Sequence, residues 1–220
     1  MSCQLCHNRK EKRFCPAIHG RICPQCCGEQ REVSLDCPED CPYLQQARAR
    51  EKTRTPEQLA GEELFTKVEI GQSFYYEREP LLGGLLYELT RLSGLHRDWN
   101  DRDVGGALTA LARNYERLTG SGIIYNESGT NPIHQTIAQE LEKRIDEYRQ
   151  LEQQKLGYSS LKNSDVLKAL VFLVRTALVR TTGRPRSRAF LSYLAEQFPA
   201  VREKTGLVGG GSASGLIVPP

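Results

Sequence analysis

The chain has no cysteine after Cys41, although it is 220 residues long. It also has no apolar run that approaches the roughly 18–20 residues of a membrane-spanning helix. The longest candidate, Val166 to Val179, is interrupted by Lys168 and Arg175. We therefore expect no membrane association, and all eight cysteines are left to serve one short N-terminal segment.

A secretory signal is also missing, because the first fifteen residues contain no apolar stretch. We therefore expect a cytoplasmic protein. Thiols stay reduced in the cytosol, and clustered cysteines in that compartment are more often metal ligands than disulfides. The cysteines are thus predicted to bind metal.

Net charge says little about the partner. The formal charge is +3, and residues 1–54 account for all of it with ten Lys/Arg and seven Asp/Glu. If seven cysteines bound two zinc ions as thiolates, they would add three negative charges and leave the protein close to neutral. The apparent basicity is therefore a weak argument for a nucleic-acid partner.

Four pairs of candidate ligands recur in the first 41 residues. They are Cys3-x2-Cys6, Cys15-x3-His19, Cys23-x2-Cys26 and Cys37-x3-Cys41. Two such residues, separated by two or three others, can close on one metal through a tight turn, and two tetrahedral zinc ions need four pairs. The spacing therefore predicts a module that holds two zinc ions.

The pairs can be used in sequence or interleaved. When they are interleaved, the first and third pairs hold one zinc ion, and the second and fourth pairs hold the other. This ligand order over residues 3–41 resembles the cross-brace fingers of the RING, MYND and HIT types. Those families are mostly protein-interaction modules, so the resemblance implies a docking or structural role. No such resemblance extends to residues 55–220.

Cys27 leaves the ligand set open. It could replace His19 at the second zinc, because the neighbouring side chains of Cys26 and Cys27 point in different directions. The alternative is a one-zinc module built from Cys15, Cys23, Cys26 or Cys27, Cys37 and Cys41. A redox role for Cys23-x2-Cys26 is disfavoured, because thioredoxin-like motifs lie in a βαβ context that is absent here.

The sequence gives little indication of catalysis. Nothing in the cysteine spacing leaves a metal position open for water, as a catalytic zinc requires. Asp98, Asp101 and Asp103 lack the glycine and terminal glutamate of a calcium loop, so we expect them to cap helices.

We predict a non-enzymatic adaptor or regulatory protein whose finger and helical domain bind a protein partner. The alternatives are a nucleic-acid-binding protein and an enzyme with a pocket in the helical domain.

Composition divides the chain into four parts and predicts a mainly α fold. Residues 1–46 form the Cys-rich module, which has too few apolar residues to fold without metal. Residues 47–57 are a charged linker with a helix start, and residues 58–204 are an all-α domain. The last part, 205–220, is rich in glycine and is predicted to be a disordered tail.

The central helix of this domain is predicted to begin at Asn163 or Ser164 and to run to about Thr182. Its apolar residues cover nearly every side, which is typical of a buried helix. A long helix before it should begin at Pro132 and end at Gly157. Further helices are expected over 65–79, over 81–92 and from Ser187 to Phe198, the last helix being closed by Pro199. Another helix, with its apolar stripe over 104–118, should begin at Asn100 or Asp101 and stop at Gly120.

Five arginines and no acidic residue occur between Arg175 and Arg188. Arginine forks bind oxyanions bidentately, and the turn from Gly183 to Pro185 would hold several of them on a rigid corner. The alternative is that these cations complement a helix dipole or pair with internal carboxylates. We predict an anion or partner site at Arg180, Arg184, Arg186 and Arg188.

Overall fold

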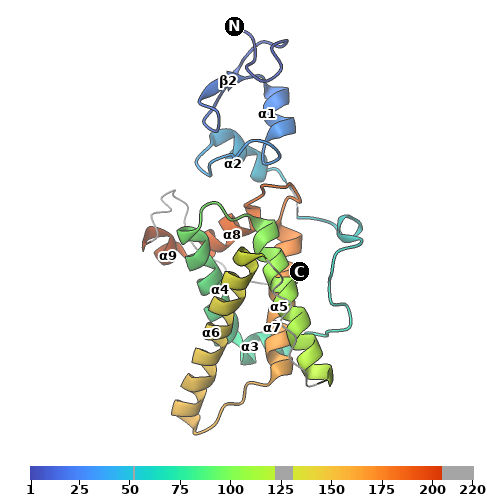
Figure 1. Cartoon of the computed structure of the whole chain (residues 1–220), viewed down its shortest axis with the longest axis vertical. Helices are drawn as coiled ribbons and strands as arrows, with labels where there is room; N and C mark the ends of the chain where they lie inside the picture. The colour runs from blue at the N-terminus through green and yellow to red at the C-terminus, as the bar shows by residue number, and fades with distance from the viewer. Residues whose placement is uncertain (52, 122–130, 205–220) are drawn as a thin grey trace.

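A computed structural model gives the fold of the chain and describes residues 1–51, 53–121 and 131–204. The tail at 205–220 lies outside these residues. Figure 1 shows a small N-terminal module at one end of an elongated molecule and a bundle of helices below it. Helices dominate the described ranges, in which the strands form one two-stranded sheet. The predicted mainly α fold, with a Cys-rich module before an all-α domain, is confirmed.

The module contains a short β-hairpin. β1 (Arg13–Cys15) pairs antiparallel with β2 (Gly20–Ile22), and Cys15 lies opposite Gly20. The side chain of Gln4 lies over Gly20, where a Cβ would be 1.6 Å from its Oε1, and the amide of Gln4 donates to the carbonyl of Arg21 at 3.1 Å. The hairpin thus brings the first residues of the chain against β2.

Two short helices complete the module. α1 (Pro24–Gln30) and α2 (Pro42–Arg48) each begin with a proline directly after a cysteine. Proline suits this position because the first helical residue needs no amide hydrogen bond. Cys23 and Cys41 therefore stand at the two helix N-termini. The core of the module consists largely of buried cysteines, with Ile22 and Leu35 as its buried aliphatic members.

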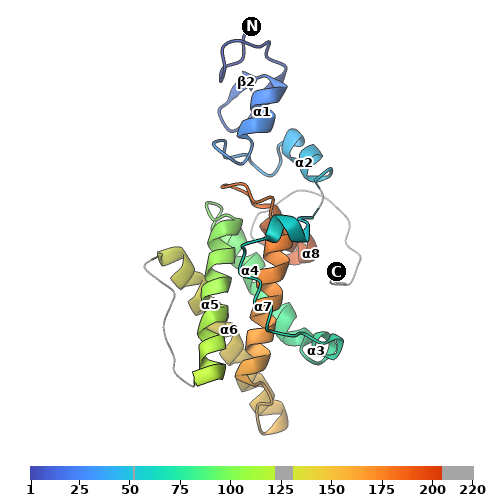
Figure 2. The ribbon, with the colours of Figure 1, turned by 90° about the vertical axis from the view of Figure 1, so that its right-hand side faces the viewer.

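The helical domain is organised around α7 (Asn163–Arg180). α7 packs along α5 (Asp101–Ser121), and Figures 1 and 2 show the two side by side. α5 also packs on α6 (Pro132–Leu156), and α4 (Glu79–Leu95) contacts both α6 and α8 (Ala189–Gln197). The bundle thus surrounds α7 on several sides.

Burial along α7 confirms that it is the central helix. Residues 169–174 are all buried, so nearly two consecutive turns are covered on every face. Its apolar residues satisfy this environment without a polar side chain in that stretch. No helix in the described part of the chain is both long and apolar enough to cross a membrane.

The ends of α6 follow from local chemistry. Oδ1 of Asn131 accepts a hydrogen bond from the amide of Ile133 at 2.9 Å, and Pro132 is the first helical residue. At the other end Gly157 has φ 82°, a left-handed conformation that glycine adopts without a steric penalty. The predicted start and end of this helix are confirmed.

The predicted helix over 65–79 is wrong in its first half. Only α3 (Gln72–Glu77) is helical, and residues 65–71 are not. The guanidinium of Arg175 donates hydrogen bonds to the carbonyls of Leu64, Phe65 and Val68 at 2.8–2.9 Å. A side chain of α7 thus binds all three carbonyls, and within the described ranges only that of Phe65 also accepts a backbone amide, from Val68, in a single turn.

The end of the domain also differs from the prediction. α8 does end before Pro199, but it is not the last helix, because α9 (Pro199–Lys204) follows at once. Proline stops a helix that precedes it and is equally suited to begin the next one. The linker contains one 3-10 turn, η1 (Pro56–Leu59), with Thr55 at its N-cap.

Candidate metal centre

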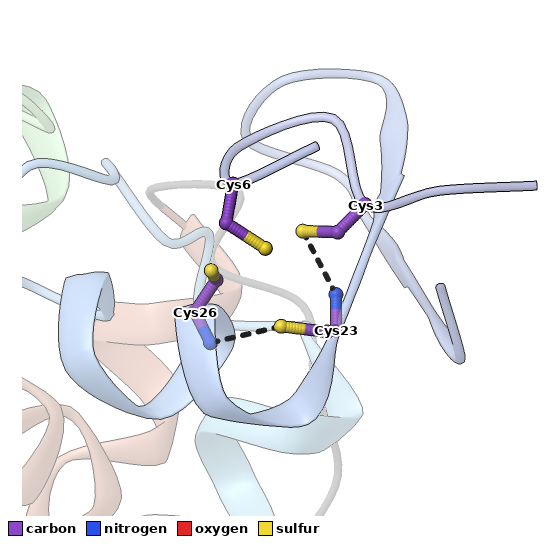
Figure 3. Close-up of side chains that lie close together, drawn as sticks. All are labelled: Cys3, Cys6, Cys23 and Cys26. Carbon is purple, nitrogen blue, oxygen red and sulfur yellow. Dashed lines mark hydrogen bonds between the residues drawn. The ribbon is translucent and has the colours of Figure 1, made fainter. Parts of the chain in front are cut away.

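Four thiols meet in the module. The sulfur atoms of Cys3, Cys6, Cys23 and Cys26 all lie within 4.8 Å of one another. Figure 3 shows them pointing toward a common centre from the N-terminal loop and from the start of α1. Three of the four cysteines are buried and Cys6 is partly so. The first and third ligand pairs of the sequence are thus combined in one group.

Backbone amides hold these sulfur atoms in place. The amide of Cys26 donates to Sγ of Cys23 at 3.4 Å, because Cys23 is the N-cap of α1. The amide of Cys23 donates to Sγ of Cys3 at 3.2 Å, which ties the N-terminal loop to the helix. Figure 3 draws both bonds. His7 turns the chain back with φ 53°, and its amide donates to the carbonyl of Cys3.

The four thiols do not titrate alike. Burial raises the pKa of Cys3, but hydrogen bonds from the backbone of Cys6, Cys23 and Leu5 outweigh it and lower that pKa to about 6. The backbone amide of Cys26 likewise lowers the pKa of Cys23. By contrast, the hydrogen bond with Cys23 and burial raise the pKa of Cys26 to about 12. Neighbouring thiolates repel one another, so the full set can ionise only around a cation.

An arginine lies against the same cluster. Nη1 of Arg9 is 3.8 Å from Sγ of both Cys23 and Cys26. Its cationic N–H groups supply outer hydrogen bonds to sulfur, which partly offset the negative charge of several thiolates. The pKa of Arg9 is raised by its hydrogen bond to Cys23 and by the nearby thiolate charges.

The donor set fits a structural metal ion. Four thiolates around one centre suit Zn²⁺ or an iron–sulfur centre, and a Zn–S bond of about 2.3 Å places tetrahedral sulfurs about 3.8 Å apart. The limit of 4.8 Å in this cluster is compatible with that spacing after a small contraction. All four positions are filled by protein, so the geometry leaves no place for a reacting water.

The remaining cysteines line one cavity. Cys15, Cys27, Cys37 and Cys41 surround it together with apolar side chains that include Leu44. Burial raises the pKa of Cys37, a hydrogen bond from the backbone of Glu32 lowers it, and the charges of Cys41 and Cys15 raise it. Among the described residues, only the sulfur atoms of Cys3, Cys6, Cys23 and Cys26 form a group in which all lie within 4.8 Å of one another.

The histidines of the module, His7 and His19, have exposed side chains. His19 is exposed in the turn between β1 and β2, where it has φ 50°, and it does not line the cavity. His7 is also exposed. Cys27 lines the cavity together with Cys15, Cys37 and Cys41, and Nη1 of Arg13 donates to its sulfur at 3.4 Å.

Arg184 and Arg188, from the arginine-rich corner, lie between the module and the helical domain. Nη1 of Arg184 donates to the carbonyls of Gly28 and Arg31 at 3.1 and 2.6 Å. The guanidinium of Arg188 donates to the carbonyls of Ser93, Arg97 and Trp99 and to the carboxylate of Glu39. These two side chains join parts of the chain that are distant in sequence.

On the side of the metal module, Glu32 takes part in the contacts with the helical domain. Its side chain is buried, and Oε1 accepts from Nη2 of Arg48 at 2.8 Å. Its carbonyl accepts the amide of Arg186 at 2.9 Å. Nη1 of Arg48 in turn reaches Oγ of Ser192 on α8 at 2.6 Å. The module is therefore attached to the bundle by a network of polar bonds.

Two arginines of the corner remain on the surface. Arg180 is exposed, and its guanidinium lies 4.2 Å from the ring centroid of Tyr193. The side chain of Arg186 is exposed as well. An external anion would therefore meet Arg180 and Arg186 more readily than Arg184 and Arg188.

Asp101, close to Trp99, acts as a capping group. The carboxylate of Asp101 is buried and accepts from Oγ of Ser187 and from the amides of Phe190 and Leu191. It thereby caps α8 from the start of α5. Burial raises the pKa of Asp101, while these hydrogen bonds act in the opposite direction.

Comparison with known proteins gives no relative from which to transfer a function. No family model matches the chain, and no curated protein or solved structure matches it either. The function must therefore be argued from the geometry of this molecule.

Sequence reasoning missed the residues that support the thiols and the interface. Neither Arg9 nor Arg13 was a candidate site residue, yet each donates to a cysteine sulfur. Glu32 and Arg48 carry no sequence signal of their own, because their partners lie far along the chain. Only the alternation of basic residues with cysteines around Arg13 hinted at such pairing.

Proposed function

We propose that this protein is a zinc-stabilised, non-enzymatic adaptor of the cytoplasm. The observation that carries the proposal is the closed group of Cys3, Cys6, Cys23 and Cys26. Four protein thiolates complete a tetrahedral shell, so the ion folds the module and performs no reaction. We further propose that the metal is zinc and that the module holds two ions.

Zinc is favoured by the ligands and by the compartment. Iron–sulfur clusters also accept four cysteines, but a mononuclear tetrahedral site in a small hairpin-and-helix module is the usual setting of structural zinc. In a reducing compartment the thiols stay free to bind it. Burial of Cys3 and Cys23 supports a structural ion rather than a redox pair.

A protein partner is supported by the surface of the module. Phe14 is 52% exposed on β1, and Leu5, Ile18 and Val33 are exposed apolar side chains of the same module. Exposed aromatic and aliphatic groups favour contact with protein, whereas a nucleic-acid surface would be dominated by cations. Arg180 and Arg186 extend the surface toward an acidic partner.

The metal claim is tested on the full chain purified under reducing conditions. Elemental analysis should find two zinc ions per chain, and Cys3→Ser should remove one of them. His7→Ala is the matched control, because His7 neighbours the cluster and is exposed; it should keep the full content. Absence of stoichiometric metal, or unchanged zinc in Cys3→Ser, would overturn the proposal.

The choice between a protein and a nucleic-acid partner has its own test. Fluorescent RNA and DNA oligonucleotides should show no specific binding to the zinc-loaded chain at physiological salt. Binding that weakens steeply as salt rises, and that Arg180→Glu with Arg186→Glu abolishes, would favour the nucleic-acid alternative instead.

A further inference from the structure

We propose a second metal site formed by Cys15, Cys27, Cys37 and Cys41, which His19 does not complete. This inference rests on the proposed function, since it assigns the ligands of the second ion. Its first support is convergence: four cysteines from separate parts of the module line one cavity. Three of them are buried and Cys37 is partly buried.

The secondary structure places these ligands as it places those of the first site. Cys15 ends β1, Cys27 lies on α1, and Cys41 is the N-cap of α2. Cys41 thus stands before a proline-initiated helix, as Cys23 does in the first site. Both sites would then combine an N-cap cysteine with ligands from a loop or strand.

Consecutive residues on α1 can serve two different metals. Side chains of neighbouring helical residues diverge by about 100° around the axis. Cys26 therefore faces the first group, and Cys27 faces the cavity on another side of the helix. A histidine ligand is not needed, since the cavity already has four sulfur donors.

An arginine accompanies each group of thiols. Arg9 donates to Cys23 and Cys26 in the first group, and Arg13 donates to Cys27 in the second. The guanidinium of Arg13 also lies 4.6 Å from the ring centroid of Tyr43, which fixes its position. Four thiolates around a divalent ion leave two negative charges, and a fixed cation beside the sulfur compensates part of them.

The second site would also hold the module against the helical domain. The loop between Cys27 and Cys37 supplies the carbonyls of Gly28 and Arg31 that Arg184 binds. It also supplies Glu32, which contacts Arg48. Metal at the second site would fix both ends of this loop, so its occupancy is coupled to the interface.

Cobalt substitution of the full chain counts the ligands directly. Apo-protein is titrated anaerobically with Co²⁺ and without any other ligand. Thiolate-to-cobalt charge-transfer absorption grows with the number of bound sulfurs, and tetrahedral d–d bands report the geometry. The wild type should bind two ions through all eight cysteines. His19→Ala should give the same spectrum and stoichiometry.

Two variants at Cys27 make the test decisive. Cys27→Ala should bind one ion fewer than the wild type. Cys27→His offers a replacement ligand, so it should keep two ions with charge-transfer absorption lowered by one eighth. This variant keeps the test informative if Cys27→Ala fails to fold.

Three results would overturn the second site. They are one cobalt ion in the wild type, loss of an ion in His19→Ala, and an unchanged spectrum in Cys27→His. If the wild type binds one ion and Cys3→Ser binds none, the second site fails while the first survives. If Cys3→Ser leaves cobalt binding unchanged, the proposed function fails as well.

Discussion

Arg184→Ala should release the metal module from the helical domain without unfolding either part. In the folded protein Nη1 of Arg184 donates to the carbonyls of Gly28 and Arg31, and its side chain is partly buried. Alanine removes the donor and leaves both carbonyls of the module loop without this partner. The bonds within each part are untouched.

The size of the effect follows from the two bonds. A hydrogen bond to a charged group contributes about 1.5–3 kcal/mol, and two bonds from one guanidinium are less than additive. We therefore expect Arg184→Ala to lower the free energy of undocking the module by about 2–4 kcal/mol. The two carbonyls lose their partner only in the docked state, because in the undocked state they bind water. This corresponds to about a 30- to 1,000-fold rise in the undocked fraction.

Amide hydrogen exchange at Arg186 measures this fraction. Its amide donates across the interface to the carbonyl of Glu32 at 2.9 Å, so it exchanges when the module undocks. Arg180→Ala is the matched control, because Arg180 lies on Tyr193 and makes no contact with the module loop. Residues 185 and 186 are unchanged in both variants, so intrinsic exchange rates are comparable.

The reasoning is refuted if protection at Arg186 is the same in Arg184→Ala and in the wild type. It is also refuted if Arg180→Ala lowers protection as much as Arg184→Ala does. Zinc content serves as the check that the module itself remains folded. Loss of zinc in Arg184→Ala would mean that the corner is needed for folding rather than for docking.

Two further predictions concern the helical domain. Leu170 is fully buried on α7, so Leu170→Ala should lower the free energy of unfolding by about 3–5 kcal/mol in thermal unfolding, while the zinc content stays constant. A loss below about 1 kcal/mol would contradict the central place of α7. Burial disfavours ionised Glu152, but hydrogen bonds from Ser159, Ser160 and Leu161 outweigh it and lower the pKa of Glu152. Its stabilisation is therefore present above the ordinary carboxyl pKa and lost as pH falls through the lowered value. Glu152→Gln should lower Tm at neutral pH and match the wild type in acid; an equal loss at both would refute this.

The helices that the sequence predicted best are those with local signals at their ends. Asn131, Pro132 and Gly157 bound α6 through their own hydrogen bonds and backbone angles. The continuous apolar character of α7 likewise indicated burial on all sides. Both depend on residues close in sequence, so one sequence is enough to find them.

The errors arose where distant contacts decide the structure. Residues 65–71 were predicted to be helical, yet the carbonyls of Phe65 and Val68 accept hydrogen bonds from Arg175, more than a hundred positions later. The anion or partner site at the corner stays a prediction, but which of its arginines pair internally also depends on distant contacts: Arg184 and Arg188 donate to groups of the chain itself. Such long-range pairs leave no periodic signal.

The metal ligands were predictable in part. Spacing identified Cys3-x2-Cys6 and Cys23-x2-Cys26 as ligand pairs, because the turn geometry of each pair is local, but it left open whether the pairs are used in sequence or interleaved. The structure brings these two pairs together. The choice between His19 and Cys27 was left open by spacing. In the structure Cys27 lines the cavity with Cys15, Cys37 and Cys41, whereas His19 is exposed in the hairpin turn, and our proposal of Cys27 as the ligand rests on this difference.

X-ray absorption at the zinc edge of the purified full chain tests the central claim most directly. The account predicts stoichiometric zinc surrounded by sulfur alone at about 2.3 Å, with no imidazole or oxygen in the inner shell. Cys3→Ser should lower the zinc content and leave a sulfur-only signal from the second group. A sample without bound metal, or a shell that contains nitrogen or an exchangeable water, would contradict the account.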